Sequence, residues 1–199
     1  PSPVGNTLIA TWAAASDDVW AVGEWGALVH WNGTAWQRVE TNTNLTLHAV
    51  WGSGSADVWA AGDEGLLMHW DGEGWASSGG TRGAYIYDLW GSGPNDVWAV
   101  GAYGRIFRWN GQGWSEVTSG TSSYLRAVWG ADPGDVWVVG EGGTLLHFDG
   151  AKWTPAVSPT TEWLVSVYGF ASNDVWAVGD NATIVRFNGT SWTRLTFGG

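Results

Sequence analysis

Two groups of side chains in this sequence could do chemistry: aromatic rings that lie beside carboxylates, and histidines or arginines that recur at one spacing. The first group falls outside the strand positions that repeat along the chain. Its members are Trp25, Trp163, Tyr85, Tyr103, Tyr124, Glu24, Asp63, Glu141 and Asp180. Rings stack on apolar ligand faces and carboxylates accept hydrogen bonds, so these nine residues are the candidates for binding a ligand.

The second group occupies one register beside an aromatic residue: His30, His69, Arg108, His147 and Arg186. Arginine replaces histidine twice, and it cannot ligate a metal as histidine does, so we expect no metal site. These side chains are instead expected to stack on a tryptophan or to pair with an aspartate. The recurring aspartates Asp18, Asp57, Asp96, Asp135 and Asp174 are expected to accept hydrogen bonds from loop amides.

Composition and spacing argue against an enzyme. The chain has no cysteine, which removes thiol catalysis and zinc–thiolate sites. No Ser-His-Asp or phosphate-loop pattern is present, and the seven arginines do not gather at one register as a sialidase-like hydrolase would require. We therefore expect no catalytic residues and no cofactor.

The charge balance also restricts the partners. Lysine and arginine number 8 against 19 aspartates and glutamates, a net charge of −11. Such a chain repels phosphate backbones and anionic head groups. No apolar run approaches the length of a membrane span. We expect neither nucleic acid binding nor membrane insertion.

The elements that must position the candidate residues follow from a repeat. The stretch Asp96–Gly101 returns in near-copies at Asp18, Asp57, Asp135 and Asp174, always 39 residues apart. A fixed period of this length is typical of stacked copies of one supersecondary unit. The repeats are expected over residues 7–45, 46–84, 85–123, 124–162 and 163–199.

Each repeat predicts four short strands. In the second repeat these are residues 47–51, 57–61 and 66–70, with a fourth opening at Trp75. An Asp-Gly or Asn-Gly pair precedes the fourth strand in all five repeats, which is a strong hairpin signal. The second strand is apolar on both faces, so both must be covered. We predict an all-β, five-bladed β-propeller that forms a single domain over residues 1–199 and is a monomer.

Most of the 19 tryptophans belong to the scaffold. Seventeen recur at fixed strand positions, where packing between blades is the simplest interpretation. Trp25 and Trp163 are the exceptions. They fall in two kinds of loop, which emerge at the same end of an antiparallel blade together with Tyr85, Tyr103 and Tyr124.

The mixture of rings, carboxylates and amides at that end is suited to carbohydrate, because sugars present both C–H faces and hydroxyl groups. Repeated weak sites would add avidity for a multivalent glycan. The alternative is a protein-interaction surface anchored by the same aromatics, or a purely structural or engineered repeat scaffold.

The run from Asp18 to Gly23, followed by Ala27–Trp31, Asn32-Gly33 and Trp36, resembles tectonin-type lectin repeats and the degenerate Asp-box-like repeats of bacterial surface propellers. The likeness extends over essentially the whole chain, although the full Asp-box signature is absent. It implies sugar sites between adjacent blades and favours an extracellular or cell-surface location.

Overall fold

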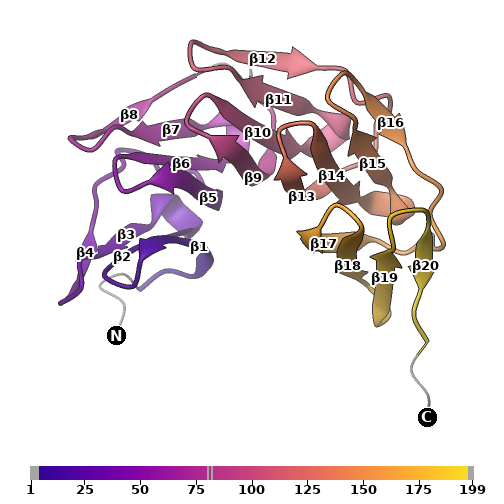
Figure 1. Ribbon diagram of the computed structural model, residues 1–199. Coiled ribbons are helices and arrows are strands. Elements are labelled where there is room, and N and C mark those ends of the chain that lie inside the picture. Colours follow the sequence, from indigo (N-terminus) through magenta and orange to yellow (C-terminus); the bar gives the residue numbers. More distant parts are fainter. Residues whose placement is uncertain (1–4, 80, 82, 197–199) are drawn as a thin grey trace. The chain divides into compact units, whose positions relative to one another are not determined.

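The computed structural model describes residues 5–79, 81 and 83–196, and within them the chain forms five sheets of four antiparallel strands (Figure 1). The first sheet holds β1 (Leu8–Ala15), β2 (Asp18–Gly23), β3 (Leu28–Trp31) and β4 (Trp36–Arg38). The second holds β5 (Leu47–Gly54), β6 (Asp57–Gly62), β7 (Leu67–Trp70) and β8 (Trp75–Ser77). The third holds β9 (Ile86–Gly93), β10 (Asp96–Gly101), β11 (Ile106–Trp109) and β12 (Trp114–Val117).

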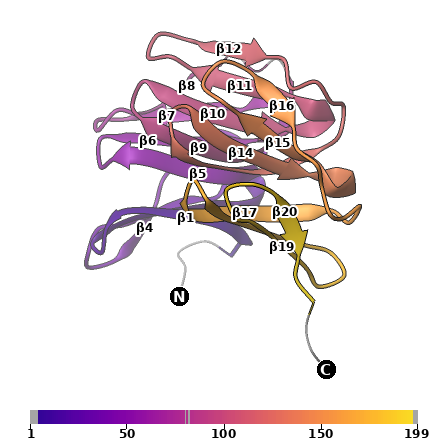
Figure 2. The ribbon, with the colours of Figure 1, turned by 45° about the vertical axis from the view of Figure 1, so that its right-hand side comes forward.

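The fourth sheet holds β13 (Leu125–Asp132), β14 (Asp135–Gly140), β15 (Leu145–Phe148) and β16 (Trp153–Pro155). The fifth holds β17 (Leu164–Ala171), β18 (Asp174–Gly179), β19 (Thr183–Phe187) and β20 (Trp192–Arg194). In every sheet, strands that follow one another in the chain are hydrogen-bonded neighbours. Figure 2 shows β16 beside β15 at the edge of its sheet. The predicted five-bladed β-propeller fold is confirmed.

The chain divides into two compact units by its internal contacts. The first unit comprises residues 1–99 and 108–115, and the second comprises residues 100–107 and 116–199. Each unit has its own apolar cluster: the first is built around Trp20, Leu28 and Leu47, and the second around Trp137 and Leu164. The organisation of residues 1–199 as one domain, and as a monomer, stays a prediction.

The second strand of each blade shows why the sheets stack. In β6 the side chains of Val58, Trp59 and Ala60 are all fully buried, although neighbouring residues point to opposite faces of the sheet. Both faces are covered within the first unit, because Val58 and Ala60 pack with Trp20 of the first blade and Trp59 lies against Trp109 of the third. This arrangement is the blade wedged between two blades that the apolar pattern predicted.

Indole rings fill the space between blades. Trp59 lies 5.0 Å from Trp109 and 5.2 Å from Trp114, centroid to centroid. Burying roughly 200 Å² of each ring contributes roughly 5 kcal/mol of transfer free energy. The close fit requires glycine on the facing strand, since a Cβ atom at Gly91 would approach the ring of Trp51 to 2.5 Å.

The recurring His/Arg register does what the sequence predicted. His69 stacks on Trp59 with ring centroids 4.1 Å apart, and its Nε2 lies 2.6 Å from Asp57 Oδ1. Where arginine takes the place of histidine, Arg108 lies over Trp98 and donates to Asp96 Oδ1 at 2.6 Å.

The recurring aspartates differ from expectation in their partners. Asp57 binds His69 with one carboxylate oxygen and accepts from the Ser53 hydroxyl with the other, so side chains satisfy it in place of the loop amides that were expected. Amide acceptance occurs at the hairpin residue, where Asp71 Oδ1 receives the amides of Glu73 and Gly74 at 2.9 Å each. The reason is geometric: the recurring aspartate begins a strand opposite the histidine or arginine of the third strand, whereas Asp71 begins a turn.

The first strand is also longer than predicted. The sequence placed a loop at 52–56, but β5 continues to Gly54, which pairs with Asp57 across a two-residue turn. Irregular register between Gly52 and Gly54 accommodates the extension.

Candidate functional site

The candidate site is built on the turn that joins the second and third strands of a blade. Four such turns are short 3-10 segments: η1 (Glu24–Gly26), η2 (Asp63–Gly65), η3 (Ala102–Gly104) and η4 (Glu141–Gly143). The first residue of the turn is tied to the loop that enters the same blade, because the Glu141 amide donates to the Tyr124 carbonyl at 2.9 Å. The Asp180 amide donates equally to the Trp163 carbonyl. The two kinds of loop therefore meet at one end of the blade, as predicted.

The middle residue of these turns has a left-handed backbone. Its φ angle is 58° at both Trp25 and Tyr103, 54° at Glu64 and 65° at Gly142. Glycine adopts this conformation freely, whereas a bulky side chain is strained there by about 1–2 kcal/mol. The rings of Trp25 and Tyr103 are nonetheless 69% and 66% exposed, so they gain little burial in return.

The glycine that ends each turn packs closely against the loop that leads to the next blade. Gly104 has a φ of 70°, and a Cβ atom there would collide with the carbonyl oxygen of Thr121. In the first unit, Gly26 faces the Thr43 carbonyl in the same way, and the Thr41 hydroxyl donates to the Gly26 carbonyl at 2.9 Å. The loop thus rests directly on the turn and leaves a groove beside it.

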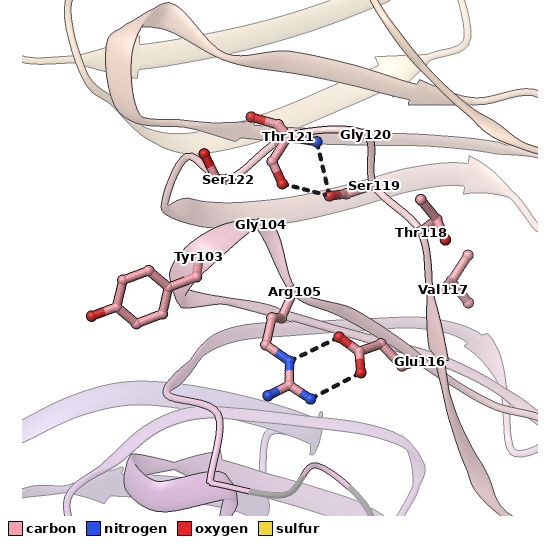
Figure 3. A pocket seen from close by; sticks show the side chains of 10 residues that line it. All are labelled: Tyr103, Gly104, Arg105, Glu116, Val117, Thr118, Ser119, Gly120, Thr121 and Ser122. Atoms are coloured by element: carbon pink, nitrogen blue, oxygen red, sulfur yellow. Dashed lines mark hydrogen bonds and ion pairs between the residues drawn. The ribbon is translucent and has the colours of Figure 1, made fainter.

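The groove in the second unit, here called the Tyr103 groove, has a volume of about 630 Å³. Figure 3 shows Tyr103 projecting outward at one end, an ion pair on one side and the hydroxyl-bearing loop on the other. The ion pair is bidentate: Arg105 Nε and Nη2 donate to the Glu116 carboxylate at 2.8 and 2.9 Å. Its lining is Tyr103, Gly104, Arg105 and residues 116–122.

A smaller groove of about 310 Å³ lies at the matching register of the first unit and is here called the Trp25 groove. It is lined by Trp25, Gly26, Arg38 and residues 40–44. Its ion pair joins Arg38 and Glu40 at 3.3 Å. Trp25 and Tyr103 stand two repeats apart in the chain, so the same fold position carries an exposed ring beside a polar groove twice.

The structure brings three of the predicted residues together. Tyr103 and Tyr124 form an edge-to-face pair with centroids 5.1 Å apart. The Glu141 carboxylate lies 3.4 Å from the backbone amide nitrogen of Tyr124. The amide and carbonyl of Tyr124 therefore both contact Glu141.

The other predicted residues do not join that cluster. Asp63 pairs with His48, whose Nε2 lies 2.7 Å from its carboxylate. Trp163 is half-buried beneath the Arg126 guanidinium, 5.7 Å from the ring centroid. Glu24 and Trp25 belong to η1, Asp180 begins the turn before β19, and Tyr85 is a partly exposed residue that precedes β9.

The sequence interpretation missed most of the groove lining. Arg105 falls at the same end of the blade as the candidate aromatics, but its spacing to Glu116 on β12 and to the loop 119–122 gives no sign that these residues meet. His48 was also missed as the partner of Asp63. The run Ser119–Ser122, with the matching run Thr41–Asn44 two repeats earlier, was the available signal.

The shifted carboxylates near the blade interiors have structural causes. The pKa of Asp174 lies below its ordinary value of 3.8, chiefly because the Arg186 guanidinium donates to it. Burial raises the pKa of Asp18, but hydrogen bonds from Ser55 and His30 outweigh that effect and lower it. Among the described residues, no group of three or more histidine, aspartate or glutamate side chains is placed to hold a metal ion.

The fold and repeats define the class: this is a tryptophan-rich β-propeller. Similar solved structures include YCF48 from Cyanidioschyzon merolae, with a TM-score of 0.73 and 16% identity over 98% of this chain and 74% of that one. YCF48 bound to D1 peptide matches with a TM-score of 0.55 and 15% identity, over 97% of this chain and 82% of that one. At these identities the likeness establishes the fold alone.

No family model matches the sequence, and no curated protein matches it. In the part of the chain that the structure describes, no helix has the length and apolar character needed to cross a bilayer.

Proposed function

We propose that this protein is a non-enzymatic, protein-binding propeller that binds an extended segment of a partner in a groove beside the turn between the second and third strands of a blade. The observation that carries this proposal is the state of Trp25 and Tyr103. Each is a large ring held in a left-handed backbone, exposed to solvent and set beside a polar groove. Strained, exposed aromatics lower the stability of the isolated chain, and such residues cluster where ligands bind.

The grooves have the chemistry of peptide recognition. Hydroxyl groups of Ser119, Thr121 and Ser122 and the Arg105–Glu116 pair line the Tyr103 groove, and they offer donors and acceptors to a peptide backbone. The ring at the mouth offers an anchor for a side chain. A propeller of similar fold, YCF48, has been solved bound to D1 peptide, which supports a peptide as the class of ligand.

The test separates binding from folding. A random peptide library displayed on phage is selected on the full chain, and enriched peptides are measured against Trp25→Gly and Tyr103→Gly. We expect at least one of these variants to weaken binding by about tenfold or more. Neither should melt at a lower temperature, because glycine relieves the left-handed strain.

Glu64→Gly is the matched control. Glu64 occupies the same turn position with the same backbone, but it is not aromatic and lines neither groove. Its replacement should relieve the same strain and leave peptide binding intact. Failure to enrich peptides above an unrelated propeller, or equal binding by all three variants, would contradict the proposal.

Carbohydrate binding is the second candidate function. Its more specific version is that the chain is related to tectonin-type lectins. The Trp25 groove favours it, because an exposed indole lies beside the amide-bearing residues Asn42 and Asn44. A glycan array probed with the full chain and with Trp25→Gly tests it. Binding that the variant loses would support a lectin, and a blank array from the folded chain would eliminate one.

A further inference from the structure

Two smaller hollows adjoin the Tyr103 groove within the second unit. The nearer hollow has a volume of about 230 Å³ and shares the loop residues 119–121 with the groove. Figure 3 shows this loop along one side of the groove. The farther one, here called the Val157 hollow, has a volume of about 340 Å³ and shares Ala156 with the nearer one. The three spaces therefore follow one another, and an extended segment that leaves the Tyr103 groove can continue into the hollows.

The lining loses its charge along this path. The fourth blade has Thr144 and Pro155 at the registers of Arg105 and Glu116, so the nearer hollow has no ion pair there. The Val157 hollow is lined by Ala156, Val157, Phe187, Thr190, Ser191 and Trp192. Its rings and aliphatic groups offer contact to an apolar side chain, whereas the Tyr103 groove offers hydrogen-bonding groups.

Two positions of the Val157 hollow differ from the equivalent positions of earlier blades. At the register of Val157 those blades carry Glu40, Gly79 and Thr118. At the register of Phe187 the first three blades carry Trp31, Trp70 and Trp109. A phenyl ring is smaller than an indole, so Phe187 leaves space that a tryptophan would fill. Val157 in turn adds an apolar side chain that is 90% exposed, the most exposed large apolar residue in the part of the chain that the structure describes.

The remaining walls of the Val157 hollow are held in place by contacts within the second unit. The ring of Phe187 lies 4.8 Å from that of Trp137, centroid to centroid, and Trp192 is 6% exposed. The amides of Thr190 and Ser191 both donate to Asn188 Oδ1 at 3.0 Å. A hollow with fixed walls costs little ordering when a ligand enters.

We propose that the Val157 hollow receives a large apolar side chain of the bound segment. This inference rests on the proposed peptide-binding function and specifies its ligand. The ligand is an extended segment whose polar part lies in the Tyr103 groove and which carries a leucine, methionine or phenylalanine farther along. Such a side chain would cover Val157 and the open face of Phe187 and so remove apolar surface from water.

The experiment uses peptides selected by phage display on the full chain and synthesised with a fluorophore. Each large apolar residue of a peptide is replaced in turn by alanine, and one such replacement should weaken binding about fivefold or more. Val157→Asp places a charge at the hollow and should produce a loss of about the same size. Because the Val157 side chain is almost fully exposed, this variant should keep the melting temperature of the parent.

Phe187→Trp tests the hollow by filling it. Trp70 and Trp109 show that this register accepts an indole, since their Nε1 atoms donate to the carbonyls of Ser55 and Pro94 at 3.0 and 3.1 Å. The variant should fold as the parent does and bind the peptide about fivefold more weakly. In this variant the alanine replacement should cost no further affinity, because the two changes remove the same contact.

Val165→Asp is the matched control for Val157→Asp. Val165 is an exposed valine on β17 of the same unit, and it lines neither the Tyr103 groove nor the two hollows. Its replacement adds the same charge and should leave the affinity within about twofold.

The outcomes separate the two proposals. Peptides that depend on no apolar side chain, that respond equally to Val157→Asp and Val165→Asp, or that need Trp25 and not Tyr103 overturn the subsite and leave peptide binding standing. A selection that enriches nothing overturns the proposed function, and the subsite with it. Dependence on an apolar side chain that disappears with Phe187→Trp supports both.

Discussion

The Trp25 and Tyr103 grooves occupy the same position in the repeat, yet they are built from different chemistry. In the Tyr103 groove, Arg105 precedes β11 and Glu116 lies on β12, and the two form two parallel hydrogen bonds at 2.8 and 2.9 Å. In the Trp25 groove, Arg38 and Glu40 are near neighbours in sequence, make a single 3.3 Å contact and are largely exposed. Only the Tyr103 groove has a second aromatic ring beside it, because Tyr124 stands where the first unit has Thr46.

The comparison shows that the repeat keeps the backbone geometry of the turn and its adjoining loop, whereas the side chains that line the groove vary. The turn glycine, the left-handed middle residue and the seated loop recur in both units. The side chains that a ligand would meet do not recur. Function in such a chain is therefore best sought where equivalent positions disagree, because equivalent positions that agree serve packing.

The largest expected effect concerns what the grooves share. Gly104→Ala places a Cβ atom against the Thr121 carbonyl and forces a left-handed alanine, so we expect a loss of about 3 kcal/mol in the free energy of unfolding. Gly26→Ala should cost about as much. Denaturant unfolding followed by tryptophan fluorescence measures both.

Gly142→Ala is the control that measures the cost of a left-handed alanine without a steric clash, because Gly142 has a φ of 65° and open space around its Cβ position. It should cost only about 1 kcal/mol. A Gly26→Ala variant as stable as the parent would show that the two grooves are not framed alike.

An intermediate effect concerns the ion pairs, in which the grooves differ. Arg105→Gln should lower the free energy of unfolding by about 1 kcal/mol, because a bidentate pair with a partly buried guanidinium is lost. Arg38→Gln removes an exposed single contact and should change it by less than about 0.3 kcal/mol. A double-mutant cycle with Glu116→Gln measures the Arg105 coupling directly. Equal losses in the two grooves would contradict the distinction drawn between them.

The smallest expected effect concerns the hairpin turn between the third and fourth strands, which is built in the same way in both units. Hydrogen bonds from the amides of Glu73 and Gly74 lower the pKa of Asp71, and those of Lys152 and Ala151 lower that of Asp149. A carboxylate whose native pKa is depressed stabilises the fold above its ordinary value of 3.8, and that contribution is lost as the pH falls through the native pKa.

Asp71→Asn and Asp149→Asn keep the amide acceptor and remove the titration. Each should therefore reduce the drop in melting temperature between about pH 5 and pH 3 by a similar small amount. Asn110 already holds this position in the third blade, where its Oδ1 accepts the amides of Gln112 and Gly113 at 3.0 Å each. A larger pH response in either variant than in the parent would show that the sign is wrong.

The scaffold follows from signals that are local in the sequence. The 39-residue period, the doubly apolar second strand and the Asn/Asp-Gly hairpins are local signals, and each predicted a strand or turn that the structure contains. The stacking of His69 on Trp59 was predictable too, because a histidine or arginine that recurs beside an aromatic residue at a fixed register is expected to stack on a ring.

The assembly of the candidate site, in contrast, depends on contacts between segments that are distant in the chain. Glu116 and Arg105 lie 11 residues apart on separate segments, and the antiparallel register brings them together. The pairing of Tyr103 with Tyr124 depends on how one blade's turn meets the next blade's entering loop. Local sequence also could not show that Trp25 and Tyr103 have a left-handed backbone, because both residue types ordinarily avoid that conformation.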